Sequence, residues 1–295
     1  MATIISVIND KGGVAKTTTV ANLGTALWLL GKRVLLVDTD MQCNLTFVMD
    51  KTVVNSEHNI MTWMMGPKDA EPPVYERYNG LDFIPSCTSN SSLENYLRAK
   101  SAGGDRQFAM RMAMIDKYYD YIIVDCSPGC TSHINTNVLE ASNYIIVPIR
   151  ADIFSVTGRE MLLEHVNAIR DLDYDLKILG ALITHFEPNT SMGKTIKNYY
   201  RSKADMELIP VQIKKSERIN QGLAVQQTVF EYAPGSNPAD EYMMLAEWMI
   251  NKLERKTPLP RRKTWTAEAW GKKAKAAFSA FIKRQEEETG QQNKD

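Results

Sequence analysis

The sequence lacks several features that would place it in a specialised class of protein. Its 295 residues contain no stretch of about 18 uncharged apolar residues, so we expect no membrane span. The opening residues, "MATIISVIND", lack the basic start and the cleavage site of a secretion signal. Cysteine is scarce and occurs only at Cys43, Cys87, Cys126 and Cys130. These absences favour a reducing, cytoplasmic setting over a disulfide-bonded secreted fold.

Neither sign of charge is in excess over the whole chain, which has 35 Lys and Arg against 35 Asp and Glu. The balance is nevertheless uneven along the sequence. Residues 252–295 carry 12 basic and 6 acidic residues, whereas residues 1–251 carry 23 and 29. An acidic body therefore bears a basic tail. Such a tail either meets an anionic partner or is simply solvated, and the charge pattern leaves both interpretations open.

Short apolar runs rich in β-branched residues alternate with segments of helical spacing, and 44% of the chain is hydrophobic. The apolar runs predict buried strands over residues 3–9, 33–40, 121–125, 143–149 and 177–184. Helical spacing covers residues 17–31, 157–172 and 192–206. Strands without polar alternation, separated by helices, predict a doubly wound, mostly parallel α/β sheet with helices on both faces.

Composition also divides the chain into parts. The stretch "KTPLPRRK" (256–263) contains two prolines and a run of charge, which cannot continue a helix and predict a linker. We therefore expect one α/β domain over residues 1–254, followed by a linker and a tail over residues 255–295. Residues 50–80 are rich in Met, Pro and Asn and predict loops.

The stretch "VINDKGGVAKTTTV" (7–20) lies between the first predicted strand and helix, which is the context that a phosphate-binding loop requires. Glycines let backbone N–H groups converge on phosphate oxygens, and the helix N-terminus adds partial positive charge. Lys16 can then reach the β- and γ-phosphates, and the Thr17 hydroxyl can bind Mg²⁺. The match to G-x-x-x-x-G-K-[ST] is incomplete, because Asp10 and Ala15 stand where the outer glycines belong. The alternative interpretation is a tight β–α turn with solvent-facing lysines.

Two further motifs, "VLLVDTDMQCN" (34–44) and "YIIVDCSPG" (121–129), are apolar strands that end in aspartate. The carboxyl ends of strands in an open parallel sheet form the ligand crevice, so Asp38, Asp40 and Asp125 should lie near the phosphate loop. Asp125 fits the carboxylate that supports a metal, and Asp40 could orient or deprotonate an attacking water. The alternative interpretation is that these aspartates only cap helices or form turns.

The motifs "KGGVAKTTT", "VLLVDTDMQCN" and "YIIVDCSPG" together resemble those of ParA/MinD-type ATPases, the deviant Walker group of P-loop NTPases. The resemblance covers most of residues 1–250 and is closest to the ParA-type partition ATPases. It implies slow, Mg²⁺-dependent hydrolysis of ATP by a homodimer that closes as a nucleotide sandwich. It also implies that the second lysine, Lys11, reaches the ATP of the partner subunit. A cation from the neighbour offsets charge on the transferring phosphoryl group.

Carried over position by position, the resemblance assigns roles to residues of this chain. The implied catalytic residues are Lys11, Lys16 and Asp40. The implied nucleotide contacts are Lys11, Gly12, Gly13, Val14, Ala15, Lys16, Thr17, Thr18, Asp152, Pro210, Val211 and Gln212. The implied metal-binding residues are Thr17, Asp40 and Asp125. Among the nucleotide contacts, Asp152 is implied to reach the partner's nucleotide, and residues 210–212 to lie near the base.

Three departures from the family pattern surround the implied site. The family usually has Gly where Ala15 stands, and a Cβ there crowds the loop if the backbone needs a positive φ. "MQC" (41–43) replaces the usual Pro-Gln-Gly after Asp40, and "CSPG" (126–129) replaces the usual Pro-Pro after Asp125. Despite these departures we expect the protein to bind ATP, but the sequence does not predict fast hydrolysis.

The resemblance to ParA-type ATPases also implies partners. Such proteins bind DNA without sequence preference once dimeric, associate with the nucleoid in the cytoplasm, and segregate plasmid or chromosomal cargo until a ParB-like protein stimulates hydrolysis. Non-specific DNA binding requires a Lys/Arg surface. The candidates are Lys194, Lys197, Arg201 and Lys203 on the predicted helix 192–206, and Lys214, Lys215 and Arg218 on the next helix. Each of these residues could equally belong to an ordinary solvated helix face.

The stretch "TAEAWGKKAKAAFSAFIKRQEEE" (266–288) predicts a basic amphipathic helix in the tail. Its apolar stripe could pack on the body or a dimer mate, or it could bind nucleic acid or a partner protein. It could also lie on anionic lipid, which gives the alternative function of a MinD-like, membrane-associated positioning ATPase. A third functional interpretation is a metal-cluster or reductase relative, such as the nitrogenase iron protein, which resembles this fold. That protein needs a pair of cysteines, and only Cys130 lies near the right position.

Overall fold

The computed structural model describes residues 1–254 except 89–90, 101–105, 151–156, 173 and 204. Asp152 and the tail over residues 255–295 lie outside the described residues, and the predictions for them stay predictions. Within the described part of the chain, no helix combines the length and the apolar character needed to cross a bilayer.

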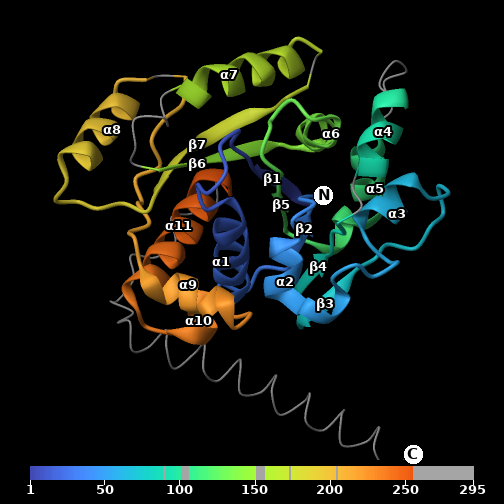
Figure 1. The fold of residues 1–295 in the computed structure, drawn as a ribbon, viewed down its shortest axis with the longest axis horizontal. Coiled ribbons are helices and arrows are strands. Elements are labelled where there is room, and N and C mark those ends of the chain that lie inside the picture. The colour runs from blue at the N-terminus through green and yellow to red at the C-terminus, as the bar shows by residue number, and fades with distance from the viewer. Residues whose placement is uncertain (89–90, 101–105, 151–156, 173, 204, 255–295) are drawn as a thin grey trace, which may run out of the picture.

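A seven-stranded sheet runs through the centre of the described residues, with the strand order β3-β4-β2-β5-β1-β6-β7 (Figure 1). The strands are β1 (Thr3–Val7), β2 (Val34–Asp38), β3 (Tyr75–Tyr78), β4 (Leu81–Ile84), β5 (Tyr121–Asp125), β6 (Tyr144–Arg150) and β7 (Lys177–Thr184). Among these strands only β3 and β4 pair antiparallel, which confirms the predicted mostly parallel sheet. Val7 and Asp38 both pair with Asp125, so the carboxyl ends of β1, β2 and β5 lie level at one edge.

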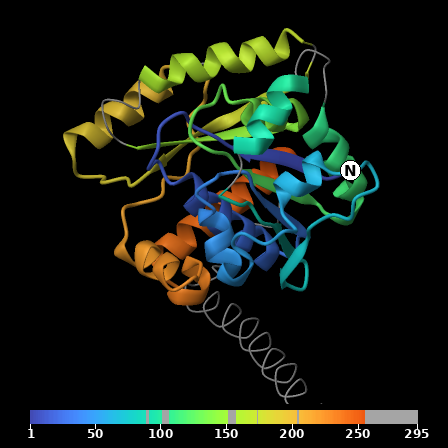
Figure 2. The same ribbon diagram turned by 45° about the vertical axis from the view of Figure 1, so that its right-hand side comes forward.

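Helices cover both faces of the sheet (Figures 1 and 2). They are α1 (Lys16–Leu29), α2 (Asn44–Asp50), α3 (Ile60–Met65), α4 (Ser91–Lys100), α5 (Gln107–Ile115), α6 (His133–Ala141), α7 (Thr157–Arg170), α8 (Ser191–Arg201), α9 (Glu217–Ala224), α10 (Val229–Tyr232) and α11 (Asn237–Leu253), with 3₁₀ turns η1 (Lys51–Val53) and η3 (Asp116–Tyr118). The helices α1, α2 and α9 to α11 pack on one face, and α3 to α8 pack on the other. This is the doubly wound arrangement that the sequence predicted.

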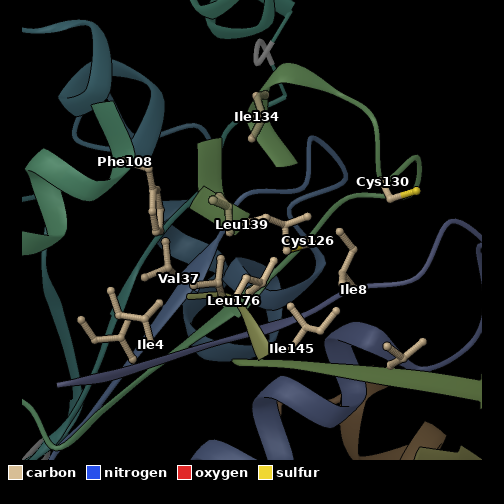
Figure 3. Packing of buried hydrophobic residues seen from close by; sticks show 14 of the residues in the cluster. Ile4, Ile8, Val37, Phe108, Cys126, Cys130, Ile134, Leu139, Ile145 and Leu176 are labelled. Atoms are coloured by element: carbon tan, nitrogen blue, oxygen red, sulfur yellow. The ribbon is translucent and has the colours of Figure 1, made fainter. Parts of the chain in front are cut away.

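Successive residues of the central strands enter different hydrophobic clusters, because side chains alternate between the two faces of a sheet. Ile5 and Val7 of β1 belong to the cluster under α1 and α11. Ile4 of β1 belongs to the opposite cluster, which also contains Phe108, Ile134 and Leu139 from the helices of that side (Figure 3). Burial on both faces explains why these strands show continuous apolar runs without polar alternation.

Helix α1 packs unusually closely on the sheet, and this holds its N-terminus at the sheet edge. A Cβ added to Gly24 would lie 2.4 Å from Cδ2 of Leu36 on β2. A larger residue at position 24 would therefore have to displace the buried side chain of Leu36. The N-terminus of α1 is where the predicted phosphate loop ends.

Three sequence-based expectations for secondary structure were wrong. Residues 50–80 are not only loops, since they contain η1, α3 and β3. Asn59 begins α3 through a capping box with Thr62, and β3 carries charged residues because it is the antiparallel edge strand. The helix predicted over 192–206 ends at Arg201, so Lys203 lies beyond it. Lys214 and Lys215 precede α9 instead of lying on it.

Candidate nucleotide-binding site

The loop between β1 and α1 is anchored to two neighbouring strands before any ligand binds. The side chain of Asn9 donates from Nδ2 to the carbonyl of Pro148 on β6 (2.7 Å), and its Oδ1 accepts from the backbone N–H of Lys11 (3.0 Å). On the other side, the hydroxyl of Thr184 at the end of β7 donates to the carbonyl of Val14 (3.1 Å). The loop is therefore preorganised by contacts at both ends.

Two residues of this loop adopt the left-handed backbone conformation. Gly13 has a φ of 70°, and Ala15, the N-cap residue of α1, has a φ of 67° and a ψ of 37°. Glycine takes up this conformation without strain, whereas an L-residue with a Cβ is strained there by roughly 1–2 kcal/mol. The concern that Ala15 stands where the backbone needs a positive φ is thus confirmed.

We expect Ala15→Gly to relieve this strain and to tighten ATP binding. The gain in folding free energy should not exceed about 1 kcal/mol, because added glycine freedom in the unfolded chain offsets part of the relief. Thermal unfolding and ATP titration of the two proteins would measure both effects. Ala15→Val is the contrasting variant and should lower both stability and affinity. Weaker ATP binding by Ala15→Gly than by the natural protein would contradict the strain argument.

Lys16 is the buried cation of the loop. Its Nζ donates to the main-chain carbonyls of Asn9 (3.0 Å) and Lys11 (3.1 Å), and only 7% of the residue is exposed. Burial lowers the pKa of the Lys16 ammonium below its ordinary value, while the nearby Asp125 and Asp40 act in the opposite direction. A desolvated ammonium that donates to carbonyl groups can exchange those contacts for the stronger interaction with a phosphate oxygen.

A cavity of about 630 Å³ opens directly beside Lys16. The phosphate loop and the first turn of α1 form one wall, with Gly12, Gly13 and Thr17 among them. Asp40 and α2 form a second wall, Pro128 forms a third, and α9 closes the cavity from the side of the chain's C-terminal half. A larger cavity of about 710 Å³ lies among residues 55–73 and 87–88 and includes none of the predicted site residues.

Asp125 has the features of a residue that supports a cation. It ends β5, is 1% exposed, and its Oδ2 is buried without a hydrogen-bond partner among the described residues. Burial and the neighbouring Asp38 raise the pKa of Asp125 well above its ordinary range, whereas Thr17 and Lys16 act to lower it. A buried carboxylate oxygen without a partner is costly unless a positive charge compensates it. The pair of Thr17 and Asp125 therefore fits a bound Mg²⁺.

The two aspartates near the end of β2 have different environments. Asp40 borders the cavity, is 8% exposed, and accepts from the backbone N–H of Gln42 at 3.0 Å. Asp38 is completely buried and accepts from both the N–H (2.8 Å) and the hydroxyl (2.7 Å) of Thr46 on α2. Burial raises the pKa of Asp38 to about 6. Asp38 does not line the cavity, and its carboxylate instead fastens α2 to the sheet.

The sequence is similar to that of several known proteins. A protein-family model described as an AAA domain matches residues 2–178. The sporulation initiation inhibitor protein Soj of Bacillus subtilis is 31% identical over 253 residues, which are 84% of this chain and 98% of Soj. The chain belongs to this family, as a ParA-type ATPase.

Solved structures agree with this membership. The cobyrinic acid a,c-diamide synthase of Mycobacterium smegmatis, with bound ADP and magnesium, matches with a TM-score of 0.73 and 26% identity, covering 90% of this chain and 100% of that chain. A putative plasmid partition protein of Borrelia burgdorferi bound to AMPPNP matches with a TM-score of 0.71 and 26% identity, covering 86% and 100%. The predicted ATP and Mg²⁺ agree with the adenine nucleotides and the magnesium bound in these solved relatives.

The ATPase has a further, smaller cavity of about 50 Å³, and Ala15 lines both this cavity and the phosphate cavity. His185, which follows β7, and residues 213–216 line the smaller cavity. The residues predicted near the base are not among its lining: Val211 is 7% exposed in the hydrophobic core, and the Gln212 side chain accepts from Lys197. Sequence reasoning missed His185. Its position directly after a parallel strand could have revealed it, by the same rule that identified the aspartates.

Four of the seven basic residues predicted to bind DNA are engaged within the ATPase itself. Lys214 pairs with Glu241 (2.9 Å), and Lys215 with Glu187 (3.4 Å). The Nζ of Lys197 donates to Gln212 (3.2 Å), and that of Lys203 lies 5.0 Å from the ring centre of Tyr199. The remaining three are exposed, and their side chains form no ion pair within the described part of the chain: Lys194, Arg201 and Arg218.

Proposed function

We propose that this ParA-type ATPase is a DNA-partition protein. In its ATP state it forms a homodimer that binds DNA without sequence preference, and it thereby positions plasmid or chromosomal cargo in the cytoplasm. A ParB-like partner stimulates hydrolysis and releases the dimer from DNA. The observation that carries the proposal is a combination of two features in one protein. The phosphate loop contains two lysines, Lys11 and Lys16, and the helices α8 and α9 carry exposed basic residues.

The chemistry of the site follows from residues that already surround the cavity. The backbone N–H groups of Gly12 and Gly13 and the N-terminus of α1 bind the phosphates, and Lys16 neutralises the β- and γ-phosphates. Thr17 and Asp125 would hold Mg²⁺, which would supply positive charge to the transferring phosphoryl group. Asp40, which lines the same cavity, orients the attacking water and accepts its proton.

Lys11 completes the site of the partner subunit in this proposal. Its own main chain is already used within the loop, where its N–H binds Asn9 and its carbonyl accepts from Lys16. The same hydrogen bonds therefore fix the positions of Lys11 and Lys16 in the loop. A cation supplied by the neighbour couples dimerisation to the presence of ATP, as an arginine finger does. Asp152 is the acidic residue that we assign to the partner's nucleotide.

The base of ATP occupies the side of the site near the smaller cavity. His185, Lys214 and Lys215 surround this cavity together with Ser216. We therefore assign base contacts to residues 213–216, directly after the segment 210–212 that the family resemblance implied. Asn220 borders both cavities and lies between the proposed phosphate and base positions.

DNA binding in this proposal depends on the three exposed residues Lys194, Arg201 and Arg218. The other four candidates would have to break contacts within the protein before they bind a DNA phosphate. This lowers the net free energy that they contribute to DNA binding. We expect the triple Ala variant to bind non-specific DNA more weakly and with a shallower salt dependence. The slope of log affinity against log salt should fall by about one for each DNA phosphate that the variant no longer neutralises.

The test consists of two measurements. The first is sedimentation in the presence of ADP, ATP or a slowly hydrolysed analogue, and the second is a DNA titration at two salt concentrations. The proposal expects dimers only with ATP or the analogue, and DNA binding only by those dimers. Lys177→Ala is the matched control, because Lys177 is exposed and paired with Asp175 on the far edge of the sheet. ATP-dependent flotation with anionic liposomes, without DNA binding, would replace the proposal by the membrane-associated alternative.

A further inference from the structure

The loop between β5 and α6, residues 126–132, forms the wall of the phosphate cavity that contains Pro128. The loop is fixed to α6, and α6 in turn is fixed to α4. The side chain of Asn135 on α6 donates from Nδ2 to the carbonyls of Ser127 (3.0 Å) and Gly129 (2.9 Å). Glu94 on α4 accepts from the backbone N–H groups of α6 at His133 (2.7 Å) and Ile134 (3.1 Å). The loop therefore has a defined position relative to these helices.

On the inner side the same loop is tied to the phosphate loop by Asp10. Oδ1 of Asp10 accepts from the backbone N–H of Cys130 (3.2 Å) and from its thiol (3.7 Å). Gly129 has a φ of 86°, which lets the chain turn immediately before this amide. Burial and the neighbouring Asp10 raise the pKa of the Cys130 thiol to about 11, so the thiol stays a donor at neutral pH. Cys130 is fully buried in the second core cluster (Figure 3).

Asp10 thus connects the phosphate loop with the loop that carries Pro128, and residues of both loops line one cavity. Asp10 directly precedes Lys11, whose carbonyl accepts from Lys16, and its carboxylate reaches the loop that carries Pro128. The two contacting residues are 120 positions apart in the sequence. Asp10 also stands where the common phosphate-loop pattern has a glycine, so the carboxylate distinguishes this chain from that pattern.

We propose that Asp10 is a positioning residue of the ATPase, whose carboxylate holds loop 126–132 against the phosphate loop so that the cavity is formed before ATP enters. A site whose parts are already ordered spends less of its binding free energy on ordering them. Residues around a phosphoryl-transfer site must also keep their positions to within roughly 0.5 Å to act efficiently. Without the tether, ATP must order loop 126–132 as it binds, and the apparent affinity falls accordingly.

A competing explanation is that Asp10 acts only through its charge near Lys16. The two explanations separate in Asp10→Asn, because the amide oxygen still accepts the hydrogen bond from Cys130 while the negative charge is lost. Asp10→Ala removes both the acceptor and the charge. Cys130→Ala removes the thiol but keeps the backbone N–H that makes the shorter hydrogen bond. Asp175→Ala is a matched control on the surface, where Asp175 is exposed and pairs with Lys177.

The experiment measures amide hydrogen exchange over residues 126–132 in the full-length, nucleotide-free protein, together with KM and kcat for ATP. We expect Asp10→Ala to speed exchange of the Cys130 amide about tenfold or more, because it removes a hydrogen bond to a charged acceptor. KM for ATP should rise several-fold, with a smaller change in kcat. Asp10→Asn and Cys130→Ala should stay within about threefold of the natural protein in exchange and KM. Unchanged exchange over β1 and α6 shows that Asp10→Ala is folded.

Two outcomes would overturn the proposal. The first is Asp10→Ala with exchange at Cys130 equal to that of the natural protein. The second is Asp10→Asn with a KM as high as that of Asp10→Ala although the Cys130 amide stays protected, which would assign the effect to charge. The exchange measurement uses neither nucleotide nor DNA. Its result therefore stands whether or not the proposed role in DNA partition holds.

Discussion

Substitution of Lys16 by alanine is expected to weaken ATP binding at least about 100-fold and to abolish ATP-dependent dimerisation. Lys16 is a buried ammonium at the phosphate cavity, and its Nζ donates to the carbonyls of Asn9 and Lys11. Removing one partner of a buried charge pair costs about 2–5 kcal/mol, and each 1.4 kcal/mol is a factor of ten in affinity. The alanine side chain would also leave the two carbonyls without a donor.

ATP titration and sedimentation of Lys16→Ala would measure these effects. Lys177→Ala serves as the control for loss of one lysine charge, because it is exposed and far from the cavity lining. The thermal stability of Lys16→Ala without nucleotide should change little, since relief from the desolvation of the ammonium offsets the loss of its two hydrogen bonds. Near-normal ATP affinity in this variant would show that the loop does not bind phosphate.

Substitution of Asp40 by alanine is expected to lower hydrolysis by about 10²–10⁴-fold, which is the usual contribution of a general base, while ATP binding persists. Asp40 lines the same cavity as Lys16. Its Oδ1 accepts from Gln42, so the carboxylate is held in place by its own turn. Because dimerisation depends on bound ATP and hydrolysis ends it, the variant should accumulate as an ATP-bound dimer.

Single-turnover hydrolysis and sedimentation with ATP would test this expectation. Asp175→Ala is the control for the loss of one surface carboxylate. Asp38→Ala is not a suitable comparison, because Asp38 fastens α2 through Thr46 and its loss would disturb the fold. If Asp40→Ala hydrolyses ATP as fast as the natural protein, the catalytic role of this carboxylate is wrong and another group must activate the water.

Most of the phosphate site was predictable because its parts are contiguous. A strand, a loop with glycines and lysines, and a helix follow one another within residues 3–29, and this order alone places Lys16 and Thr17 at a helix N-terminus. Asp125 was predictable for a similar reason, since it ends a strand whose apolar run is visible in the sequence. The burial of that strand on both faces produces the run.

Other parts of the site come from segments that no local pattern connects. Asp38 ends an apolar run and Asp40 follows two residues later, yet of the two only Asp40 borders the cavity. The carboxylate of Asp38 instead accepts a hydrogen bond from Thr46 on α2. Likewise, the sequence does not show which of Lys194 and Lys214 is available to bind DNA. Only the folded chain shows that Glu241 pairs with Lys214.

The order of amino acids specified the α/β class, the parallel sheet and the phosphate loop, because hydrophobic periodicity and backbone requirements act over a few neighbouring residues. Folding alone decided which polar groups meet across the sheet edge. The hydrogen bond between Asp10 and Cys130 joins residues 120 positions apart, and it depends on where β1 and β5 lie side by side. Pairings of this kind are set by strand order and packing, which no short stretch of sequence contains.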